Sequence, residues 1–182
     1  MAEHPLLPAV ALAAAAAGYL LAAARYRQML KILWTDPLTG CLVRRAGERF
    51  LAACRRRRVG VVLADVDGLK VVNDREGHAA GDRLLAAVGK VLRANVRPGD
   101  LVVRWGGDEF LVFCPGTSDE EIVLVARRLR RALEVAGLRA SVGAAACGPG
   151  ADLAEGIRLA DLRMYAEKAT RRLPGCYVAG EA

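Results

Sequence analysis

The sequence predicts an α/β fold in which apolar strands alternate with amphipathic helices. Residues 59–66 form a continuous apolar run, which is typical of a strand buried on both faces. Residues 101–105 and 109–113 are two further apolar runs that flank a Gly-Gly pair, which indicates a β-hairpin. Between these strands, apolar residues recur with helical spacing at 84, 85, 88, 91 and 92. The 182 residues accommodate one such domain with a short extra segment.

The composition favours a globular protein and leaves the class of ligand open. Hydrophobic residues make up 54% of the chain and charged residues 26%, so a core is easily buried. The net charge of +7 permits anionic ligands, lipid surfaces or nucleic acid, although a base-composition bias of the genome explains the arginine and alanine excess equally well. Aromatic and basic residues are not interleaved, which argues against nucleic-acid binding. The five cysteines lack metal-site spacing and indicate reduced thiols.

An uncharged apolar run precedes the predicted domain. Residues 5–24 are just long enough to cross a bilayer as a helix, and basic residues follow at 25, 27 and 31. This charge bias predicts a single-pass membrane helix with the carboxy-terminal domain in the cytoplasm. A cleaved signal peptide and a buried or dimer-forming soluble helix are the alternatives. Apolar positions 26, 29, 30 and 33 share one helical face, which would pair two copies or pack on the domain.

The tip of the expected hairpin carries an acidic pair where the second strand begins. Gly106 and Gly107 favour a tight primed turn, whose central residues need positive φ. Asp and Glu are poor strand formers, so Asp108 and Glu109 require an explanation of their own. Carboxylates beside glycines that admit a ligand to the backbone predict a divalent cation carrying phosphates.

A second acidic group ends the buried strand. Period-two geometry places Asp65 and Asp67 on the same side of the strand end, with the Val66 carbonyl between them. Next to the acidic pair of the hairpin, two such charges roughly 4 Å apart would repel by about 4 kcal/mol at an effective dielectric of about 20. A bound Mg²⁺ would remove this conflict, so the cluster predicts a metal site. For Asp67 we favour a structural role in the turn.

Five separately spaced motifs support this interpretation. They are Asp36-Pro37-Leu38-Thr39-Gly40 with Arg44-Arg45, then residues 65–74, 77–82, 106–110 and 160–168. Together they resemble the motifs of the GGDEF family, the diguanylate cyclases that condense two GTP molecules into cyclic di-GMP. The resemblance covers residues 35–178. The sequence departs from the family pattern at Cys41, Val43 and Leu69, where the family has Leu, Asn and Phe.

The resemblance implies a GGDEF catalytic domain over residues 35–182, and the apolar run before it predicts an N-terminal transmembrane and signalling helix over residues 1–34. The implied fold is α/β, with a central, mostly antiparallel five-stranded sheet flanked by helices, similar to the palm of nucleotide cyclases and polymerases. The implied location is the inner membrane of a bacterium.

Ser118 and Glu121 stand at capping-box spacing before a helix. Met164 and Tyr165 are expected to be core contacts.

The resemblance also implies roles for individual residues. Asp65, the Val66 carbonyl, Asp108 and Glu109 would hold Mg²⁺, with Mn²⁺ as an alternative, and Asp108 and Glu109 would be catalytic. The residues implied to bind GTP are Lys70, Asn73, Asp82, Gly106, Gly107, Lys168 and Arg172. Within this group, Asn73 and Asp82 would bond the guanine edge, while Lys70, Lys168 and Arg172 would meet the phosphates.

Arg97 and Asp100 have the position, relative to Gly106, of the family's inhibitory site for cyclic di-GMP. A surface ion pair is the alternative for these two residues. The implied active state is a homodimer in which each 3′-hydroxyl attacks the α-phosphate of the other nucleotide. A catalytically silent GTP or cyclic di-GMP receptor is the alternative function. Such a receptor is expected to have lost Asp65, Asp108 or Glu109, and all three are present.

Overall fold

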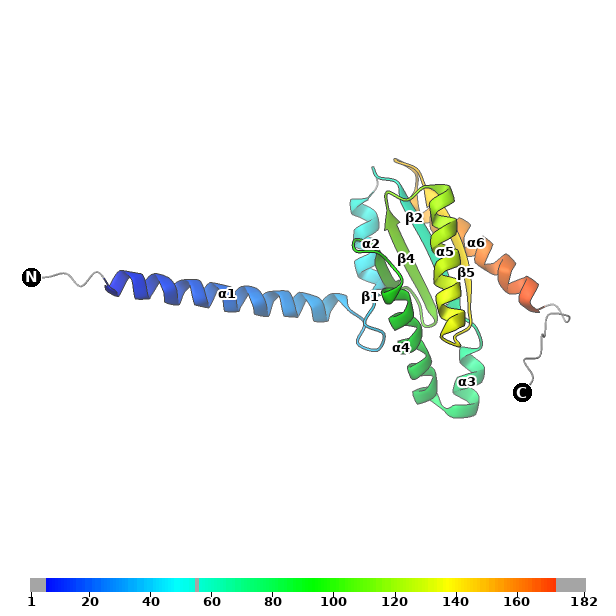
Figure 1. Ribbon diagram of the computed structural model, residues 1–182, viewed down its shortest axis with the longest axis horizontal. Helices are drawn as coiled ribbons and strands as arrows, with labels where there is room; N and C mark the ends of the chain where they lie inside the picture. Colours follow the sequence, from blue (N-terminus) through cyan, green and yellow to red (C-terminus); the bar gives the residue numbers. More distant parts are fainter. Residues whose placement is uncertain (1–5, 55, 173–182) are drawn as a thin grey trace, which may run out of the picture. The chain divides into compact units, whose positions relative to one another are not determined.

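The computed structural model describes residues 6–54 and 56–172 and divides the chain into two compact units, Met1–Thr35 and Asp36–Ala182. The first unit contains helix α1 (Leu6–Trp34). The second contains, in chain order, β1 (Leu42–Val43), α2 (Arg44–Ala53), β2 (Val59–Val66), α3 (Leu69–Glu76), α4 (His78–Ala94), β3 (Leu101–Arg104), β4 (Glu109–Pro115), α5 (Asp119–Val135), β5 (Ala140–Cys147) and α6 (Leu153–Arg172) (Figure 1).

In the part of the chain that the structure describes, no helix is both long enough and apolar enough to cross a membrane. The prediction of a single-pass membrane helix is therefore not supported. Alanine fills much of the apolar run, and its small side chain removes little apolar surface from water. The same helix also continues without a break through Arg25 to Trp34.

The five strands form one sheet in the order β1-β3-β4-β2-β5. The expected α/β architecture with a five-stranded sheet and flanking helices is confirmed. The sheet is mixed, however, and not of the mostly antiparallel type that we expected, because its edge strand β1 runs parallel to β3. The remaining neighbours, β3 with β4, β4 with β2 and β2 with β5, are antiparallel.

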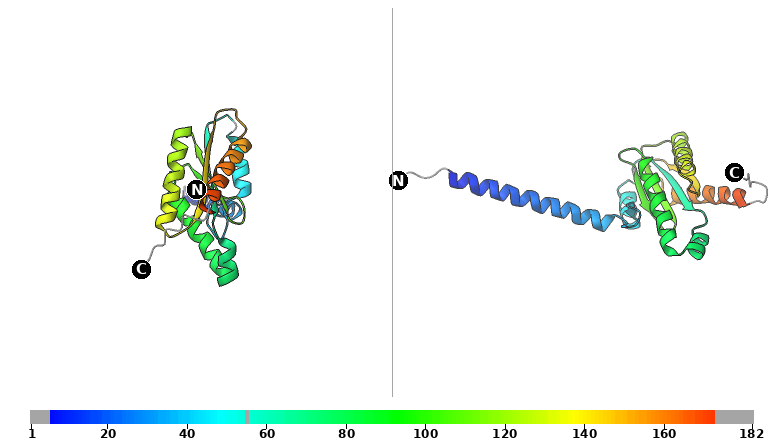
Figure 2. Two further views of the ribbon diagram at one scale, coloured as in Figure 1. Left: turned by 90° about the vertical axis from the view of Figure 1, so that its right-hand side faces the viewer. Right: turned by 60° about the horizontal axis from the view of Figure 1, so that its bottom comes forward.

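Helices cover both faces of the sheet, and β2 is buried between them. Alternate residues of β2 point to opposite cores. Val62 and Ala64 pack in a cluster with α4 and α5, whereas Val61 and Leu63 pack in a second cluster with α2 and α6. The left-hand view of Figure 2 shows α5 on one side of the sheet and α6 on the other. The continuous apolar run of residues 59–66 is thus explained by burial on two faces.

A local sequence signal accounts for the start of α5. At the start of α5, Ser118 and Glu121 form the predicted capping box, with the Glu121 amide donating to Ser118 Oγ at 3.2 Å and the Ser118 amide donating to Glu121 Oε2 at 2.7 Å. On α6, Met164 is buried as expected. The expectation for Tyr165 is wrong, because its side chain lies on the outer face of α6 and is 66% exposed.

Helix α6 approaches β5 so closely that one position on the strand has room only for glycine. A Cβ at Gly143 would lie 2.0 Å from the Ala160 carbonyl oxygen and 2.4 Å from the Met164 amide nitrogen. Both atoms belong to the backbone of α6 and cannot rotate away. The short distance between α6 and the sheet therefore depends on Gly143, and it also determines how near the later residues of α6 come to the end of β2.

We predict that Gly143→Ala destabilises the domain by about 3 kcal/mol, because the added methyl group forces α6 away from β5. Urea denaturation followed by circular dichroism would measure this change. Gly148→Ala is the matched control, since a Cβ at Gly148 has no neighbour within 4 Å. Equal stability of the two variants would contradict this account of the packing.

Candidate active site

Pairing between β2 and β4 brings the acidic residues of two distant motifs together. Asp65 and Glu109 are register partners at the ends of the two strands. One residue further on, the Val66 amide donates to the Asp108 carbonyl at 3.1 Å. Asp65, Val66, Asp108 and Glu109 thus converge at one end of the sheet, as the sequence predicted that they should if they act together.

The hairpin tip is a longer and more open loop than a two-residue turn. Strand β3 ends at Arg104 and β4 begins at Glu109, and the Trp105 amide donates to the Glu109 carbonyl at 2.8 Å. Neither Gly106 nor Gly107 lies in the left-handed region, so the expectation of a primed turn is wrong. Gly106 lies close to the acidic pair: a Cβ there would be 2.7 Å from Glu109 Oε2, so a side chain would displace the end of that carboxylate. The absence of a side chain leaves room for the carboxylate.

Arg104 ties this loop to the turn that opens the domain. Its guanidinium donates to the Gly107 carbonyl at 2.8 Å and to the Asp36 carboxylate at 3.3 Å. Asp36 also accepts from the Thr39 amide at 2.9 Å and from the Thr39 hydroxyl at 2.6 Å. Burial alone would raise the pKa of Asp36, but these Thr39 bonds and the charge of Arg104 lower it. Asp36 therefore stays ionised and holds Arg104 in place.

Electrostatic repulsion is concentrated in the acidic cluster. Burial raises the pKa of Glu109, and the negative charges of Asp65, Asp108 and Asp161 raise it further, against the opposing effect of Arg44. Burial also raises the pKa of Asp65, and the charges of Asp108 and Asp67 contribute to that increase. Clustered carboxylates of this kind are found where a cation binds or where protons are exchanged.

One cation of the protein already reaches this cluster. Lys168 Nζ, on α6, donates to Asp65 Oδ1 at 2.5 Å, and the ammonium opposes the increase in the Asp65 pKa. The sequence assigned Lys168 to phosphate and did not reveal its contact with Asp65. Arg172, the other basic residue expected to face phosphate, ends α6, but its side chain lies outside the described residues.

The donor set of the cluster fits a hard divalent cation that also binds phosphate. Within residues 6–54 and 56–172, no three Asp, Glu, His or Cys side chains are placed so that they alone could hold a metal ion. Mg²⁺, however, is usually bound by one or two carboxylates together with substrate phosphates and water. The available ligands are all oxygen atoms, from Asp65, Asp108, Glu109 and the Val66 carbonyl. A bound cation would relieve the repulsion among these carboxylates.

The residues predicted to bind guanine lie on two helices, α3 and α4. Asn73 lies on α3, and its Oδ1 atom is buried and lacks a hydrogen-bond partner. A Cβ at Gly81, on α4, would lie 2.0 Å from that atom, so Gly81 allows Asn73 to adopt its position. Asp82, the next residue of α4, is exposed. Lys70 is exposed on α3, where it can turn to a bound phosphate.

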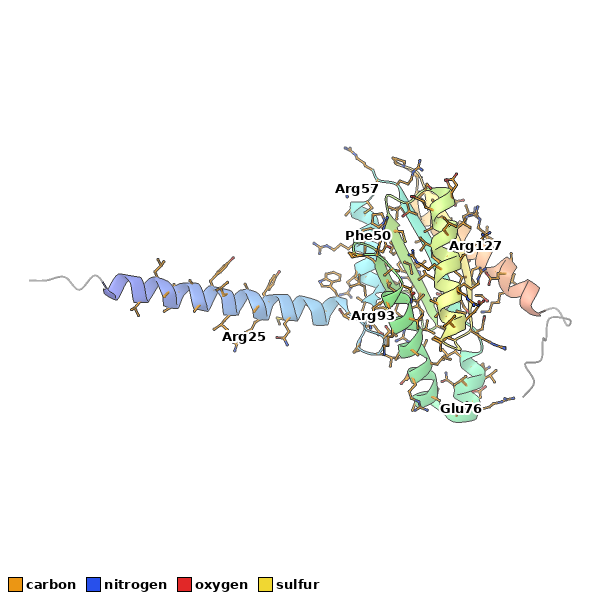
Figure 3. The ribbon with its side chains drawn as sticks, viewed as in Figure 1. Arg25, Phe50, Arg57, Glu76, Arg93 and Arg127 are labelled. Carbon is orange, nitrogen blue, oxygen red and sulfur yellow. The ribbon has the colours of Figure 1, made fainter. Side chains whose placement is uncertain are left out.

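The predicted inhibitory pair lies in a separate pocket of about 420 Å³. Arg97 Nε donates to Asp100 Oδ1 at 3.1 Å, and Arg97 Nη2 donates to the Pro115 carbonyl at 2.7 Å. The Arg97 side chain is 57% exposed, whereas the Asp100 side chain is only 1% exposed. Burial, with the charge of Asp100, raises the pKa of the neighbouring Cys114 to about 12. Arg93, labelled in Figure 3, also lines this pocket from the last turn of α4.

We predict that Glu109→Gln stabilises the domain by about 1 kcal/mol at neutral pH in metal-free buffer, because it removes a repelled carboxylate. Since the pKa of Glu109 is raised in the folded protein, the folded state binds this proton more readily than the unfolded chain. The ionised carboxylate therefore lowers stability above that pKa, and the penalty disappears as the pH falls through it.

Thermal unfolding at several pH values would test this prediction. The gain in Tm of Glu109→Gln should be about 2–4 °C at neutral pH and should vanish in acid. Asp74→Asn, which removes an exposed carboxylate on α3, is the control and should change stability by less than about 0.5 kcal/mol. A gain for Glu109→Gln that does not depend on pH would contradict the electrostatic explanation.

Comparison with known proteins indicates the same family as the motifs that converge in the candidate site. The family model described as "Diguanylate cyclase, GGDEF domain" matches residues 33–173. An uncharacterized protein in the hutH 5′ region of Streptomyces griseus is 39% identical, over 94% of this chain and 77% of that protein. The probable diguanylate cyclase DgcC of Escherichia coli is 32% identical, over 82% of this chain. The chain spans only 44% of the length of DgcC.

Solved structures share the fold. A microbial GGDEF domain studied with cyclic di-GMP is 36% identical, with a TM-score of 0.67, over 78% of this chain and 94% of that chain. The coiled coil and GGDEF domain of DgcB from Caulobacter crescentus, in complex with cyclic di-GMP, has a TM-score of 0.74 at 24% identity, over 88% of this chain and 94% of that chain. The match of the family model to most of this chain, together with the converging motifs, shows that the chain belongs to the GGDEF family.

Proposed function

We propose that this protein is a diguanylate cyclase, which condenses two GTP molecules into cyclic di-GMP and two pyrophosphates. The observation that carries the proposal is the placement of Asp65 opposite Glu109, beside Asp108 and the Val66 backbone, at the end of β2 and β4. A structural role alone does not account for this arrangement, because the carboxylates repel one another. The named cyclases among the relatives support the same activity.

In this proposal, Asp65, Asp108, Glu109 and the Val66 carbonyl hold Mg²⁺, or Mn²⁺ in its place. Such an ion polarises the α-phosphate and lowers the pKa of the attacking hydroxyl. Gly106 and Gly107 present a backbone without side chains, so a triphosphate can approach the hairpin tip. Lys168, and Lys70 from α3, neutralise the phosphate charge.

Asn73 and Asp82 select guanine. The buried Asn73 Oδ1 atom has no partner within the protein, and hydrogen bonding to a base would satisfy it. A carboxylate such as Asp82 accepts from the N1–H and the exocyclic amine of guanine, and adenine does not present this pair of donors. A site whose polar groups are left unpaired by the wrong base discriminates strongly against it.

Each subunit supplies one nucleotide, so the reaction requires a homodimer. Each 3′-oxygen forms a bond to the α-phosphorus of the opposite nucleotide, while the bond from that phosphorus to pyrophosphate breaks and the hydroxyl proton is released. In this proposal, Asp108 and Glu109 are the catalytic carboxylates. The competing function is a silent receptor. The pocket around Arg97 and Asp100 and the 36% identical GGDEF domain studied with cyclic di-GMP favour it.

We predict that the full chain converts GTP to cyclic di-GMP in the presence of Mg²⁺, and that Asp108→Asn lowers the rate by about 10²- to 10³-fold through loss of charge stabilisation. Chromatography with mass spectrometry would measure the product. Light scattering would establish that each sample is dimeric. Asp74→Asn, an acidic-to-amide change on the exposed side of α3, is the matched control and should retain the wild-type rate within a few-fold.

A folded, dimeric protein that binds GTP and makes no cyclic di-GMP would overturn the enzyme proposal and favour the receptor. A protein whose variant Asp108→Asn keeps the full rate would show instead that the hairpin carboxylate is not part of the reacting site.

We further propose product inhibition through Arg97, with Arg93 beside it at the mouth of the same pocket. Arg97→Met should raise the cyclic di-GMP concentration for half-inhibition by at least about tenfold, because a guanidinium can fork to a phosphate whereas a thioether cannot. Initial rates at increasing product concentration, each normalised to the rate without product, give this value. In the control Thr117→Val, Arg97 loses an internal acceptor at 3.1 Å but keeps its own charge, so inhibition should persist. Unchanged inhibition in Arg97→Met would place the product elsewhere.

A further inference from the structure

Lys168 contacts one partner in the structure and is assigned a second by the proposed function. In the structure its ammonium contacts Asp65 Oδ1 at 2.5 Å. Asp65 is also the carboxylate to which the proposed function assigns the divalent cation, and Lys168 is the cation assigned there to the triphosphate. An ammonium and a divalent cation on one carboxylate repel each other strongly in a site of low dielectric.

We propose that Lys168 competes with the divalent cation for Asp65, so that the nucleotide must draw Lys168 away before the metal binds tightly. This inference rests on the proposed function, because it takes the metal and triphosphate sites from it. The consequence is ordered binding. A metal ion without nucleotide meets a site in which Asp65 is already paired with an ammonium, and a nucleotide triphosphate removes that competitor.

The geometry lets the side chain move while the helix stays in place. Met164, one turn before Lys168, is buried against the sheet, and Gly143 allows the α6 backbone to lie directly on β5. Glu167, the preceding residue, forms an ion pair with Arg130 of α5. These contacts prevent α6 from rotating about its own axis. The Lys168 side chain is 24% exposed, and its four-carbon stem can swing the ammonium from Asp65 to a phosphate nearby.

The charges around Asp65 make the competition unequal. Asp108 and Asp67 act on it as negative charges, and Lys168 is the positive charge in direct contact with it. Replacing Lys168 with an uncharged residue therefore leaves the Asp65 carboxylate without the cation that contacts it. Metal affinity should rise in that variant, which is the opposite of what loss of an ordinary ligand-positioning residue would cause.

The test is Mn²⁺ binding to the full chain without nucleotide, measured by electron paramagnetic resonance of the free ion. Lys168→Met should bind Mn²⁺ about 5- to 150-fold more tightly than the wild type, the usual range for coupling between two ligands. Lys168→Arg, which keeps the charge, should bind as weakly as the wild type. Arg158→Met removes a charge from the same helix, at a residue paired with Glu155, and should leave Mn²⁺ affinity unchanged.

The outcomes separate this inference from the proposed function. If folded Lys168→Met, verified by its thermal transition, binds Mn²⁺ no more tightly than the wild type, Lys168 is not a competitor. If Lys168→Gln and Lys168→Met both bind more tightly, the inference holds even if one of them is less stable. If Asp65→Asn binds Mn²⁺ as well as the wild type does, with and without GTP, the metal site itself is misplaced and the proposed function loses its basis.

Discussion

The antiparallel pairing of β2 with β4 is the constraint on which the rest of the site depends. The ladder runs from Val59 opposite Pro115 to Asp65 opposite Glu109. A slip of one residue would turn Asp65 to the other face of the sheet, because side chains alternate along a strand. Burial of β2 on two faces prevents that slip, since its apolar side chains pack alternately in two cores. The apolar packing therefore fixes the position of a polar site.

That position is costly for the folded protein and useful for binding a cation. The folded protein would be more stable if Asp65 and Glu109 lay farther apart. Burial raises the pKa of each carboxyl group, and the neighbouring negative charges raise it further. Stability of this kind is commonly given up at functional sites. Lys168 limits this cost by pairing with Asp65, and Arg104 fixes the hairpin tip by binding Asp36. Both contacts join residues that are far apart in the sequence.

Much of the fold could be predicted from local patterns. The strand over residues 59–66, the hairpin around Gly106 and the capping box at Ser118 each depend on neighbouring residues, and the structure confirms them. The turn type at Gly106 was predicted wrongly, because a Gly-Gly pair permits positive φ but does not require it, and neither glycine adopts it here. The parallel pairing of β1 was missed, since a strand of two residues carries no periodic signal. The expectation for Tyr165 was wrong because the face of α6 that packs on β5 depends on the contact with Gly143, which is distant in the sequence.

The motifs alone also do not describe all the contacts of the candidate site. Individual motifs identified the acidic residues, and the β2–β4 register explains why they meet. The contact between Lys168 and Asp65 joins positions 103 residues apart, and no local pattern reports it.

The candidate site at the end of β2 and β4 is open to solvent. This openness gives a second reason why the proposed reaction requires another subunit. Gly107 at the hairpin tip is exposed, and Asp108 and Glu109 are only partly buried. The pocket of about 600 Å³ that includes Trp105 is lined by α2 and the start of α6 and does not include Asp65. A triphosphate bound at the tip would therefore remain accessible to water from the side away from the sheet. Covering that side with a second copy would exclude water and at the same time supply the second nucleotide, so one surface would meet two requirements of the chemistry.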